Sequence, residues 1–310
     1  ECVDVLVLPG KAGAIELASA DPQALLHPLG FTAVAGAWHV TRSVAAGTPG
    51  RFPRGPAWVV PVVAHLRGER GSEWVSDLLV TNQSGVAGQV VVARLPSGQS
   101  GNVLPALEVA LPAGESIRLD DVARASGLDD GTSSGAMLVG LDVSNPEAEV
   151  GIAVLARTYD RRAAGGPEDG MVAATPLDRG LQPGERAEIG EVSVSPGDRL
   201  AVGAASVGSS AVKLTFVAQA ADGREVGRRD LSAPVLGQAQ QPWPLPAGRW
   251  TVAVTLQRGD PAVRVFPYVS QVASDGRCRY HAASSGASRS FGQAIVVISH
   301  PVSAAGSAHE

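Results

Sequence analysis

Cysteine, lysine and aromatic residues are scarce in this sequence. Its 310 residues include two Cys, two Lys (Lys11 and Lys213), five Trp, three Tyr and five Phe, so Arg carries almost all of the positive charge. Nucleic-acid binding needs clustered Lys and Arg. Because the sequence has no such cluster and a net charge of −5, we expect no nucleic-acid partner. No apolar run reaches the roughly 18 residues of a membrane helix, so we expect no membrane-spanning segment.

Patterns that would indicate catalysis are also scarce. Residues 131–135 (GTSSG) match the GxSxG pattern around Ser133. A nucleophile elbow needs a strand before the serine and a helix after it, whereas here a loop precedes Ser133 and a strand follows. The six histidines are scattered, with no HxH or HExxH spacing. We therefore expect a protein that is not an enzyme and has no cofactor.

Two acidic pairs, Asp120-Asp121 and Asp129-Asp130, bracket one loop. Their oxygens could hold Ca²⁺, but the EF-hand spacing is absent, and Asp120 could equally cap a helical turn. The pairs could also be the two carboxylates of a glycosidase, but no sugar-binding site lined by aromatic residues is evident near them. We expect no metal site here.

Two short patterns have a simpler explanation as turns. Arg258-Gly259-Asp260 is the tripeptide that integrins recognise at a loop tip, but a turn is expected at this point in any case. Asn82-Gln83-Ser84 fits the N-glycosylation pattern, yet it also ends a predicted strand, where a turn is needed.

Period-two alternation of apolar residues is the dominant signal. Met137, Val139 and Leu141 alternate with smaller or polar residues, and after an Asn-Pro turn the alternation resumes from residue 150 to residue 156. This pattern predicts a β-hairpin over residues 135–160. A similar pattern over residues 248–275 predicts a second hairpin and indicates an internal repeat, and therefore two β domains in tandem.

The remaining strands are short and evenly spaced, with no long amphipathic helix between them. This spacing favours antiparallel sandwiches over a parallel α/β fold. The predicted organisation is an N-terminal extension (residues 1–56: a strand, a short helical turn and a linker), a first β-sandwich (57–180), a second β-sandwich (181–283) and a C-terminal tail with one strand (284–310).

Three motifs of the first sandwich resemble a known kind of module. They are Trp74-Val75-Ser76-Asp77 at a strand start, Asn82 at its end and Arg157-Thr158-Tyr159 at the close, and residues 270–275 close the second sandwich. In these motifs the chain is similar to tandem Ig-like β-sandwich modules of secreted bacterial proteins. The resemblance covers roughly residues 57–283 and implies an all-β fold of two tandem Ig-like antiparallel sandwiches with extensions at both ends. It implies no chemistry.

Cys2 and Cys278 lie near opposite ends of the chain. An even count without a CxxC pair favours one disulfide in an oxidising compartment over a zinc site, for which no second histidine lies at ligand spacing. The chain also begins at Glu1 rather than Met, as a processed exported protein would. We expect an extracytoplasmic protein that is secreted, at the cell surface or periplasmic.

The C-terminal tail contains a second candidate site. Phe291, Ile295, Val296, Val297 and Ile298 belong to an uncharged, β-rich segment whose apolar side chains would be costly to leave in water. Such a segment can complete an exposed sheet edge by strand addition. We expect residues 291–299 to form a paired strand, on their own domain or on a neighbouring chain.

These patterns favour a non-catalytic structural or scaffolding protein that works through contacts with other protein subunits, as part of a surface filament or larger complex. The alternative is a carbohydrate- or cell-surface-binding module, or an accessory region of a secreted hydrolase. An exposed Trp or Tyr lining a groove would favour the alternative. Edge strands covered by a partner would favour assembly.

The first testable prediction is the Cys2–Cys278 disulfide. Closing so long a loop stabilises a fold by on the order of 5 kcal/mol in the chain-entropy description. Intact-mass measurement after alkylation, with and without reductant, should show two masked thiols that reduction releases. Two alkylated cysteines in unreduced native protein would contradict the prediction.

Overall fold

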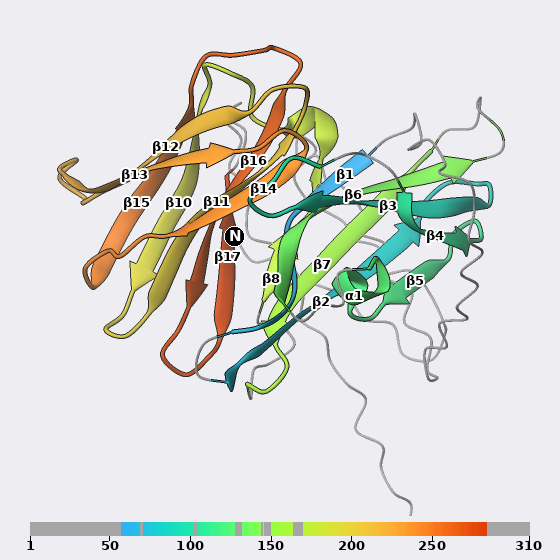
Figure 1. Cartoon of the computed structure of the whole chain (residues 1–310), viewed down its shortest axis with the longest axis horizontal. Helices are drawn as coiled ribbons and strands as arrows, with labels where there is room; N and C mark the ends of the chain where they lie inside the picture. Colours follow the sequence, from blue (N-terminus) through green and yellow to red (C-terminus); the bar gives the residue numbers. More distant parts are fainter. Residues whose placement is uncertain are drawn as a thin grey trace, which may run out of the picture.

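The structure is a computed structural model, and it describes residues 57–68, 71–101, 105–127, 132–143, 145, 150–163 and 170–283. In that part of the chain it is almost entirely β, with one short helix and one 3₁₀ turn (Figure 1). The elements of the first half are β1 (Ala57–Arg67), β2 (Glu73–Asn82), β3 (Gly88–Pro96), β4 (Pro105–Leu111), β5 (Ser116–Leu119), α1 (Val122–Ala125), β6 (Thr132–Val143), β7 (Ile152–Asp160), β8 (Met171–Ala173), β9 (Thr175–Pro176) and the 3₁₀ turn η2 (Leu177–Arg179). Those of the second half are β10 (Arg186–Val194), β11 (Arg199–Val207), β12 (Val212–Gln219), β13 (Glu225–Ala233), β14 (Gly237–Pro242), β15 (Gly248–Leu256), β16 (Arg264–Val272) and β17 (Cys278–Ala282).

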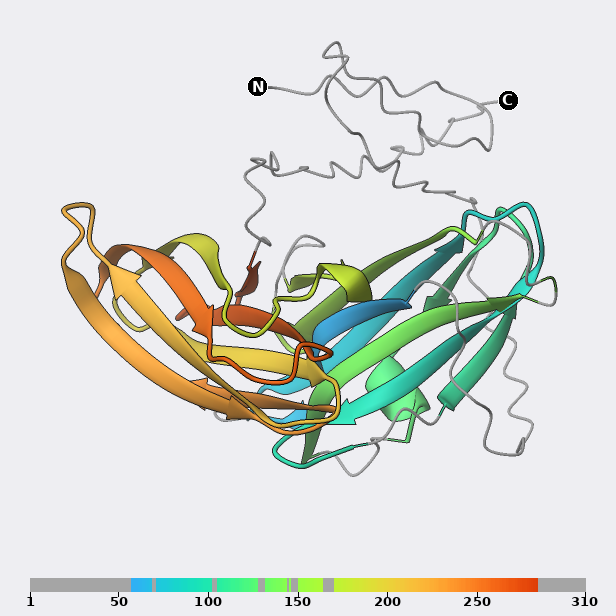
Figure 2. The same ribbon diagram turned by 90° about the horizontal axis from the view of Figure 1, so that it is seen from above.

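The strands form three antiparallel sheets. A nine-stranded sheet has the order β4-β3-β6-β1-β2-β7-β8, with β5 paired to β2 and β9 paired to β1. An outer sheet has the order β10-β15-β12-β13, and a middle sheet the order β14-β11-β16-β17. We call β1 to β9 with α1 the first unit and β10 to β17 the second unit; they lie side by side in Figure 2.

The first unit folds its sheet over on itself. β1 pairs with β6 along its length and with β2 through Leu66–Trp74 and Arg67–Glu73. The register between β1 and β6 shifts between Val60 and Val63, as expected where a strand bends around a core. Side chains from both layers then meet in one core that includes Val60, Leu78, Val92, Met137 and Val154.

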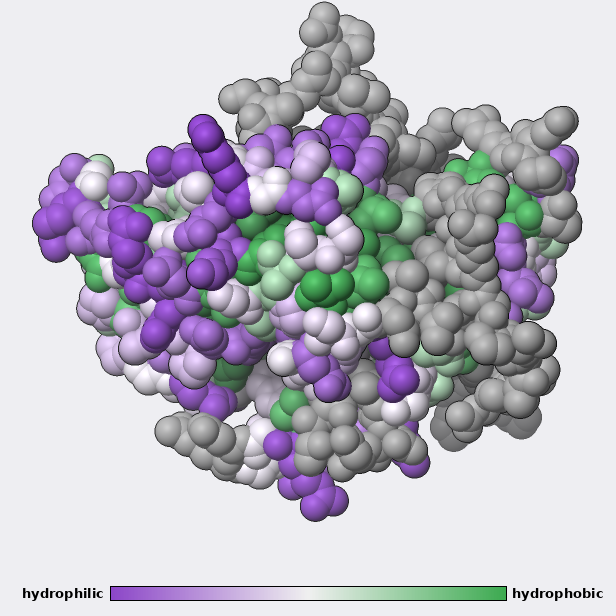
Figure 3. Space-filling model, turned by 45° about the horizontal axis from the view of Figure 1, so that its top comes forward, coloured by the Kyte–Doolittle hydropathy of each residue, from purple (hydrophilic) through white to green (hydrophobic). Residues whose placement is uncertain are grey.

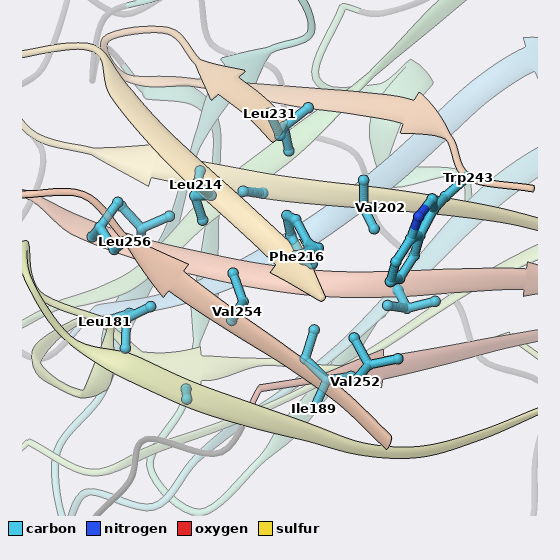
Figure 4. Packing of buried hydrophobic residues seen from close by; sticks show 14 of the residues in the cluster. Leu181, Ile189, Val202, Leu214, Phe216, Leu231, Trp243, Val252, Val254 and Leu256 are labelled. Atoms are coloured by element: carbon cyan, nitrogen blue, oxygen red, sulfur yellow. The ribbon is translucent and has the colours of Figure 1, made fainter. Parts of the chain in front are cut away.

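The outer sheet shows the alternation expected of a sheet with one wet face. Buried residues alternate with mostly exposed residues along β10 and with mostly half-buried residues along β12. Their buried side chains surround Phe216 and Trp243, whose rings pack 6.4 Å apart (Figure 4). The opposite face points to solvent, and hydrophilic side chains dominate that end of the molecule in Figure 3.

The middle sheet is different because both of its faces are covered. β11 and β16 are buried at almost every position between their ends. Val202 and Ala204 face the outer sheet, whereas Ala205 and Phe266 belong to a separate cluster with Val59 and other residues of the first unit. The second unit therefore presents an apolar sheet face to the first unit, and in Figure 1 the middle sheet lies between the outer sheet and the first unit.

Tyr268 fixes the contact between the units. Its fully buried ring belongs to the core of the first unit, although β16 is part of the second. The ring lies so close to Gly203 on β11 that an added Cβ there would overlap it. The buried amide of Gln238 donates to the Tyr268 hydroxyl at 2.5 Å, and that hydroxyl donates to Gln240 Oε1 at 2.8 Å. A fully buried hydroxyl thus has both a donor and an acceptor.

Backbone hydrogen bonds join the units at both edges of the middle sheet. Beside β14, Gly98 N–H donates to the Gln238 carbonyl at 2.8 Å. Beside β17, Gly170 N–H donates to the Cys278 carbonyl at 3.0 Å, and Thr158 N–H donates to the Gly170 carbonyl at 2.7 Å. Gly170 therefore connects β7 of the first unit to β17 of the second.

Two expectations about local structure are wrong in the same way. The stretch 135–160 is not a hairpin: β6 pairs with β1 and β3, whereas β7 pairs with β2 and β8. Likewise β15 belongs to the outer sheet and β16 to the middle sheet. In both repeats the second strand lies in the opposite layer from the first. Turn residues fix a reversal, but side-chain burial decides which strand becomes the partner.

The predicted all-β class is confirmed, and the sheets are antiparallel as expected. The structure does not confirm the Ig-like tandem arrangement, because the first unit is a single folded nine-stranded sheet. The N-terminal extension 1–56, Cys2 and the tail 284–310 with its strand at Phe291 lie outside the described residues. The Cys2–Cys278 disulfide and the paired tail strand therefore remain predictions.

The contact between Gly203 and Tyr268 generates the second testable prediction. Gly203→Ala should destabilise the protein by about 1–3 kcal/mol, because the Tyr268 ring must leave its place and disturb its hydrogen bonds. Denaturant unfolding measures the change. Gly85→Ala is the matched control, since an added Cβ there meets nothing within 4 Å; its effect should stay within about 1 kcal/mol. Equal stability of the two variants would contradict the proposed packing.

Candidate functional site

The motif residues of the first unit separate into two groups. Side chains alternate along a strand, so Ser76 and Thr158 point into the core of the first unit between β2 and β7, whereas Asp77, Arg157 and Tyr159 point outward. The inward group holds the fold together. The outward group contributes to a polar site.

The inward side chains form a buried hydroxyl pair. Ser76 Oγ and Thr158 Oγ1 lie 2.7 Å apart across β2 and β7. Ser76 Oγ also accepts the Ala64 N–H at 2.8 Å, and Thr158 donates to the Val62 carbonyl at 3.2 Å. These bonds satisfy two backbone groups of β1 beside its register shift.

Asn82 organises the turn after β2 and is fully buried. Its amide nitrogen lies within 3.1 Å of the carbonyls of Val86, Leu111 and Pro112. Its oxygen accepts Ser84 N–H at 2.9 Å and Ser84 O–H at 2.6 Å. A side chain engaged in this way in the folded protein is a turn residue, which supports the structural interpretation over glycosylation.

Asp77 is the centre of the outward group, and its side chain is 11% exposed. Its carboxylate accepts Arg118 Nη2 at 2.8 Å and the Tyr159 hydroxyl at 3.2 Å on one oxygen. The other oxygen accepts Asp121 N–H at 3.0 Å. Both oxygens of this buried carboxylate are thus hydrogen-bonded, and the carboxylate fixes the orientation of both Arg118 and Tyr159.

Tyr159 in turn supports Arg157. The Arg157 guanidinium lies over the Tyr159 ring, 4.1 Å from its centre, in a cation–π contact. Burial raises the pKa of the Tyr159 phenol, and Asp77 raises it further by its charge and hydrogen bond, against the opposing effect of Arg157 and Arg118. The hydroxyl therefore stays protonated and continues to donate to Asp77.

A second charged group adjoins the first. Asp121 accepts His65 Nδ1 at 3.0 Å and Arg161 Nη2 at 3.3 Å. Arg161 also binds Glu73 at 2.9 Å, and Arg162 binds the other oxygen of Glu73 at 3.3 Å. These pairs hold the turn after β7 against the start of β2.

These side chains border a pocket of about 200 Å³ where the two units meet, which we call the junction pocket. The end of β7 and its turn contribute Arg157, Tyr159, Asp160, Arg161 and Ala163; the turn before β17 contributes Gly276, Arg277 and Cys278.

The turn of the second unit is built to present Arg277. Asp275 accepts the Arg277 backbone N–H at 3.1 Å and its side-chain Nε at 2.7 Å. Gly276 adopts a left-handed conformation with φ of 89°, and a Cβ there would come within 3.3 Å of Ala163 Cβ. Glycine therefore permits the close approach of the two turns. Cys278 is buried beside them, and its Sγ lies 3.1 Å from the Thr158 carbonyl oxygen.

The other candidate residues lie apart from the pocket or serve the fold. Asp260 accepts Ala262 N–H at 2.9 Å and Ser209 O–H at 2.5 Å, so its carboxylate closes its own turn rather than standing free for a partner. Ser133 lies inside β6, where its backbone pairs with His65 of β1, and it does not begin a helix.

The acidic pairs also have a structural explanation where the structure describes them. Asp120 is exposed and pairs with Arg118 at 2.6 Å. The residue at the start of α1 is Asp121, without a side-chain capping bond, so Asp120 is not the capping residue that the sequence allowed as one alternative. Asp129 and Asp130 lie outside the described residues. Within the described ranges, no three His, Cys, Asp or Glu residues are grouped so as to hold a metal ion, and no helix is long and apolar enough to cross a membrane.

Comparison with known proteins yields no family. The sequence matches no protein-family model and no curated protein. A lectin from Pleurotus ostreatus in complex with GalNAc is 15% identical over 76% of this chain and 85% of its own, with a TM-score of 0.21. A glycosyl hydrolase family 2 member from Bacteroides cellulosilyticus is 9% identical over 87% of this chain and 34% of its own, with a TM-score of 0.15. Similarities this weak support no functional argument.

Alkaline titration tests the Asp77–Tyr159 contact. All three tyrosines of the chain are described, and burial also raises the pKa values of Tyr268 and Tyr280. Asp77→Asn should lower the pKa of Tyr159, because its phenolate would no longer face a carboxylate. Phenolate absorbance against pH measures this shift, with Tyr159→Phe identifying the component that belongs to Tyr159. An unchanged midpoint in Asp77→Asn would show that the two side chains do not interact.

Proposed function

We propose that this protein is a non-catalytic, extracytoplasmic binding module, and that it binds carbohydrate in the junction pocket. The observation that carries the proposal is the lining: a tyrosine and three arginines converge from two units on a space of about 200 Å³. Binding pockets usually combine a concave shape with a few polar groups held in fixed directions. Here carboxylates contact three of those groups: Asp77 accepts the Tyr159 hydroxyl, Glu73 and Asp121 pair with Arg161, and the exposed Asp275 pairs with Arg277.

The polarity of the lining supports a hydroxyl-rich ligand. Arg157, Tyr159, Asp160, Arg161 and Arg277 all carry polar side chains, and the other lining residues are Ala163, Gly276 and Cys278. Most pockets for small apolar molecules have the opposite balance, with apolar walls and few polar groups. A saccharide offers hydroxyl donors and acceptors all around its ring and fits this chemistry better than an apolar metabolite.

The two edge strands of the outer sheet argue against assembly by addition of a strand from another chain to that sheet. The edge strand β13 carries Arg228, Arg229 and Asp230, and the edge strand β10 carries Glu188 and Glu191 beside a register shift. Charged residues and bulges at an edge discourage pairing with another chain. These two edges are protected by their own sequences.

Scaffolding through protein subunits remains a second candidate because of one surface feature. Leu79 and Leu155 face each other across β2 and β7, on the outward side of the nine-stranded sheet, and both are only half-buried. Neighbouring apolar side chains on a sheet face suit a protein contact. This candidate predicts an oligomer in solution without any requirement for the junction pocket.

Arg157→Gln and Arg277→Gln test the binding proposal, because each removes one charge from one unit. Oligosaccharide binding, detected on an immobilised glycan panel and quantified by calorimetry, should weaken at least tenfold in each variant, or by about 1.4 kcal/mol. Arg249→Gln is the control, since Arg249 is exposed on the outer sheet, away from the pocket.

Two results would reject the binding proposal. One is full-strength saccharide binding in both pocket variants. The other is a wild-type protein that binds no saccharide and whose native mass by light scattering corresponds to an oligomer, which would favour scaffolding.

A further inference from the structure

Arg229 points into the second unit from the edge strand β13. In the pairing of β13 with β12, Arg229 lies opposite Phe216, a fully buried core residue. Leu231, two residues further along β13, points into the same core (Figure 4). Side chains alternate along a strand, so Arg229 shares the inward face with Leu231, whereas its neighbours Arg228 and Asp230 face solvent. A charged side chain thus occupies a position where an apolar one is expected.

Arg229 has no counter-charge in the described part of the chain. No carboxylate there pairs with its guanidinium, and its Nε is buried without a hydrogen-bond partner. The acids closest in sequence are engaged elsewhere. Glu225 binds Arg228 at 2.7 Å, and Asp230 accepts the Thr215 hydroxyl at 2.7 Å on the solvent face. An unpaired buried donor destabilises a fold, so this arginine needs an explanation other than stability.

The terminal nitrogens of Arg229 reach water at the free edge of β13. The residue is half-buried, and Nε is the one nitrogen of its guanidinium that is buried without a partner. Among the described strands, β13 pairs with β12 alone and is the last strand of the outer sheet. A long charged side chain in such a position extends along the core and leaves its charged end in water. A strand that covered this edge would therefore remove the guanidinium from water.

The backbone of β13 is well suited to pairing with another strand. Residues 227–233 pair with β12 without a break, and the register shift of this ladder lies outside that stretch. The opposite edge of such a regular strand presents a row of unpaired N–H and C=O groups, which is a template for a strand of another chain. The side chains of β13 therefore decide whether pairing occurs.

A second copy of the chain is the partner whose charges fit this edge. When two β13 strands run antiparallel with Arg229 opposite Arg229, Arg228 of each copy lies opposite Asp230 of the other. Opposite charges then face each other on the solvent side, which favours the pairing. On the inward side Gly227 lies opposite Leu231, and the two Arg229 side chains face each other. Both guanidinium groups would be enclosed between two cores without a carboxylate, which is strongly unfavourable.

We propose that Arg229 keeps two molecules of this protein from joining edge to edge, and that β13 is otherwise complementary to the β13 of a second copy. The charge acts by destabilising the paired state, and it makes no bond in the single molecule. This inference goes beyond the proposed carbohydrate-binding function. It is independent of the junction pocket, because β13 contributes no residue to that pocket.

Light scattering of the full chain over a range of concentrations tests the inference. Arg229→Leu removes the charge, and the variant should form a dimer with an affinity that exceeds any self-association of wild type by roughly tenfold or more. Arg229→Lys keeps a charge at this position and should behave as wild type. Arg228→Met is the matched control, since it removes a charge from the solvent face of the same strand. Arg229→Gln repeats the test if Arg229→Leu fails to fold.

A double variant assigns the dimer to β13. Adding Asp230→Lys to Arg229→Leu places a cation opposite Arg228 across the expected pairing, and it should return the protein to the mass of wild type. Saccharide binding should be unchanged in all of these variants, so the outcome for β13 and the outcome for the junction pocket are separate.

Four results would overturn the inference. The first is a mass equal to that of wild type in both Arg229→Leu and Arg229→Gln. The second is an equal gain of self-association in Arg228→Met. The third is a dimer of Arg229→Leu that Asp230→Lys leaves intact, because the contact would then lie elsewhere. The fourth is a wild-type dimer that Asp230→Lys alone dissociates, because β13 would then pair in spite of Arg229.

Discussion

The middle sheet has no face left for solvent, and the arrangement of the molecule depends on that constraint. One side packs on the outer sheet around Phe216 and Val202, and the other side packs on the first unit around Phe266 and Tyr268. Burying large apolar side chains contributes roughly 1.5–3 kcal/mol each, so separating the units would expose a costly surface. Backbone hydrogen bonds at both edges of this sheet fix the angle at which the units meet.

Fixed units allow a polar site to be assembled from distant parts of the chain. Arg157 and Arg277 line one pocket because the two units pack together, and Gly170 joins β7 to β17 beside them. The carboxylates behind the arginines are hydrogen-bonded to the first unit and to the turn of the second, so little side-chain entropy remains to be lost when a ligand binds. The fold therefore holds the side chains of the site in place before a ligand binds.

The sequence predicted most strands but could not predict their partners. The outer-sheet strands β10 and β12 alternate cleanly because one face is wet, and period-two patterning identifies such strands well. β11 and β16 are buried on both faces, so their sequences indicate burial without naming what covers them. The two hairpin predictions were wrong for this reason. Alternation shows which side chains of a strand are buried, but the partner of the strand depends on the layer to which the strand belongs.

The sequence likewise identified some residues of the candidate site and not others. Asp77, Arg157 and Tyr159 were recognised as motif residues, and the alternation of β2 and β7 already placed them on the face opposite to Ser76 and Thr158. What the sequence could not supply was Arg277, which reaches the pocket only through the packing of the two units. A ligand held by both Arg157 and Arg277 would bind only the docked arrangement of the units, and so would stabilise the junction in proportion to its occupancy. Binding and the burial of the middle sheet are therefore coupled: whatever loosens the packing of Tyr268 on Gly203 weakens the site, although neither residue lines it.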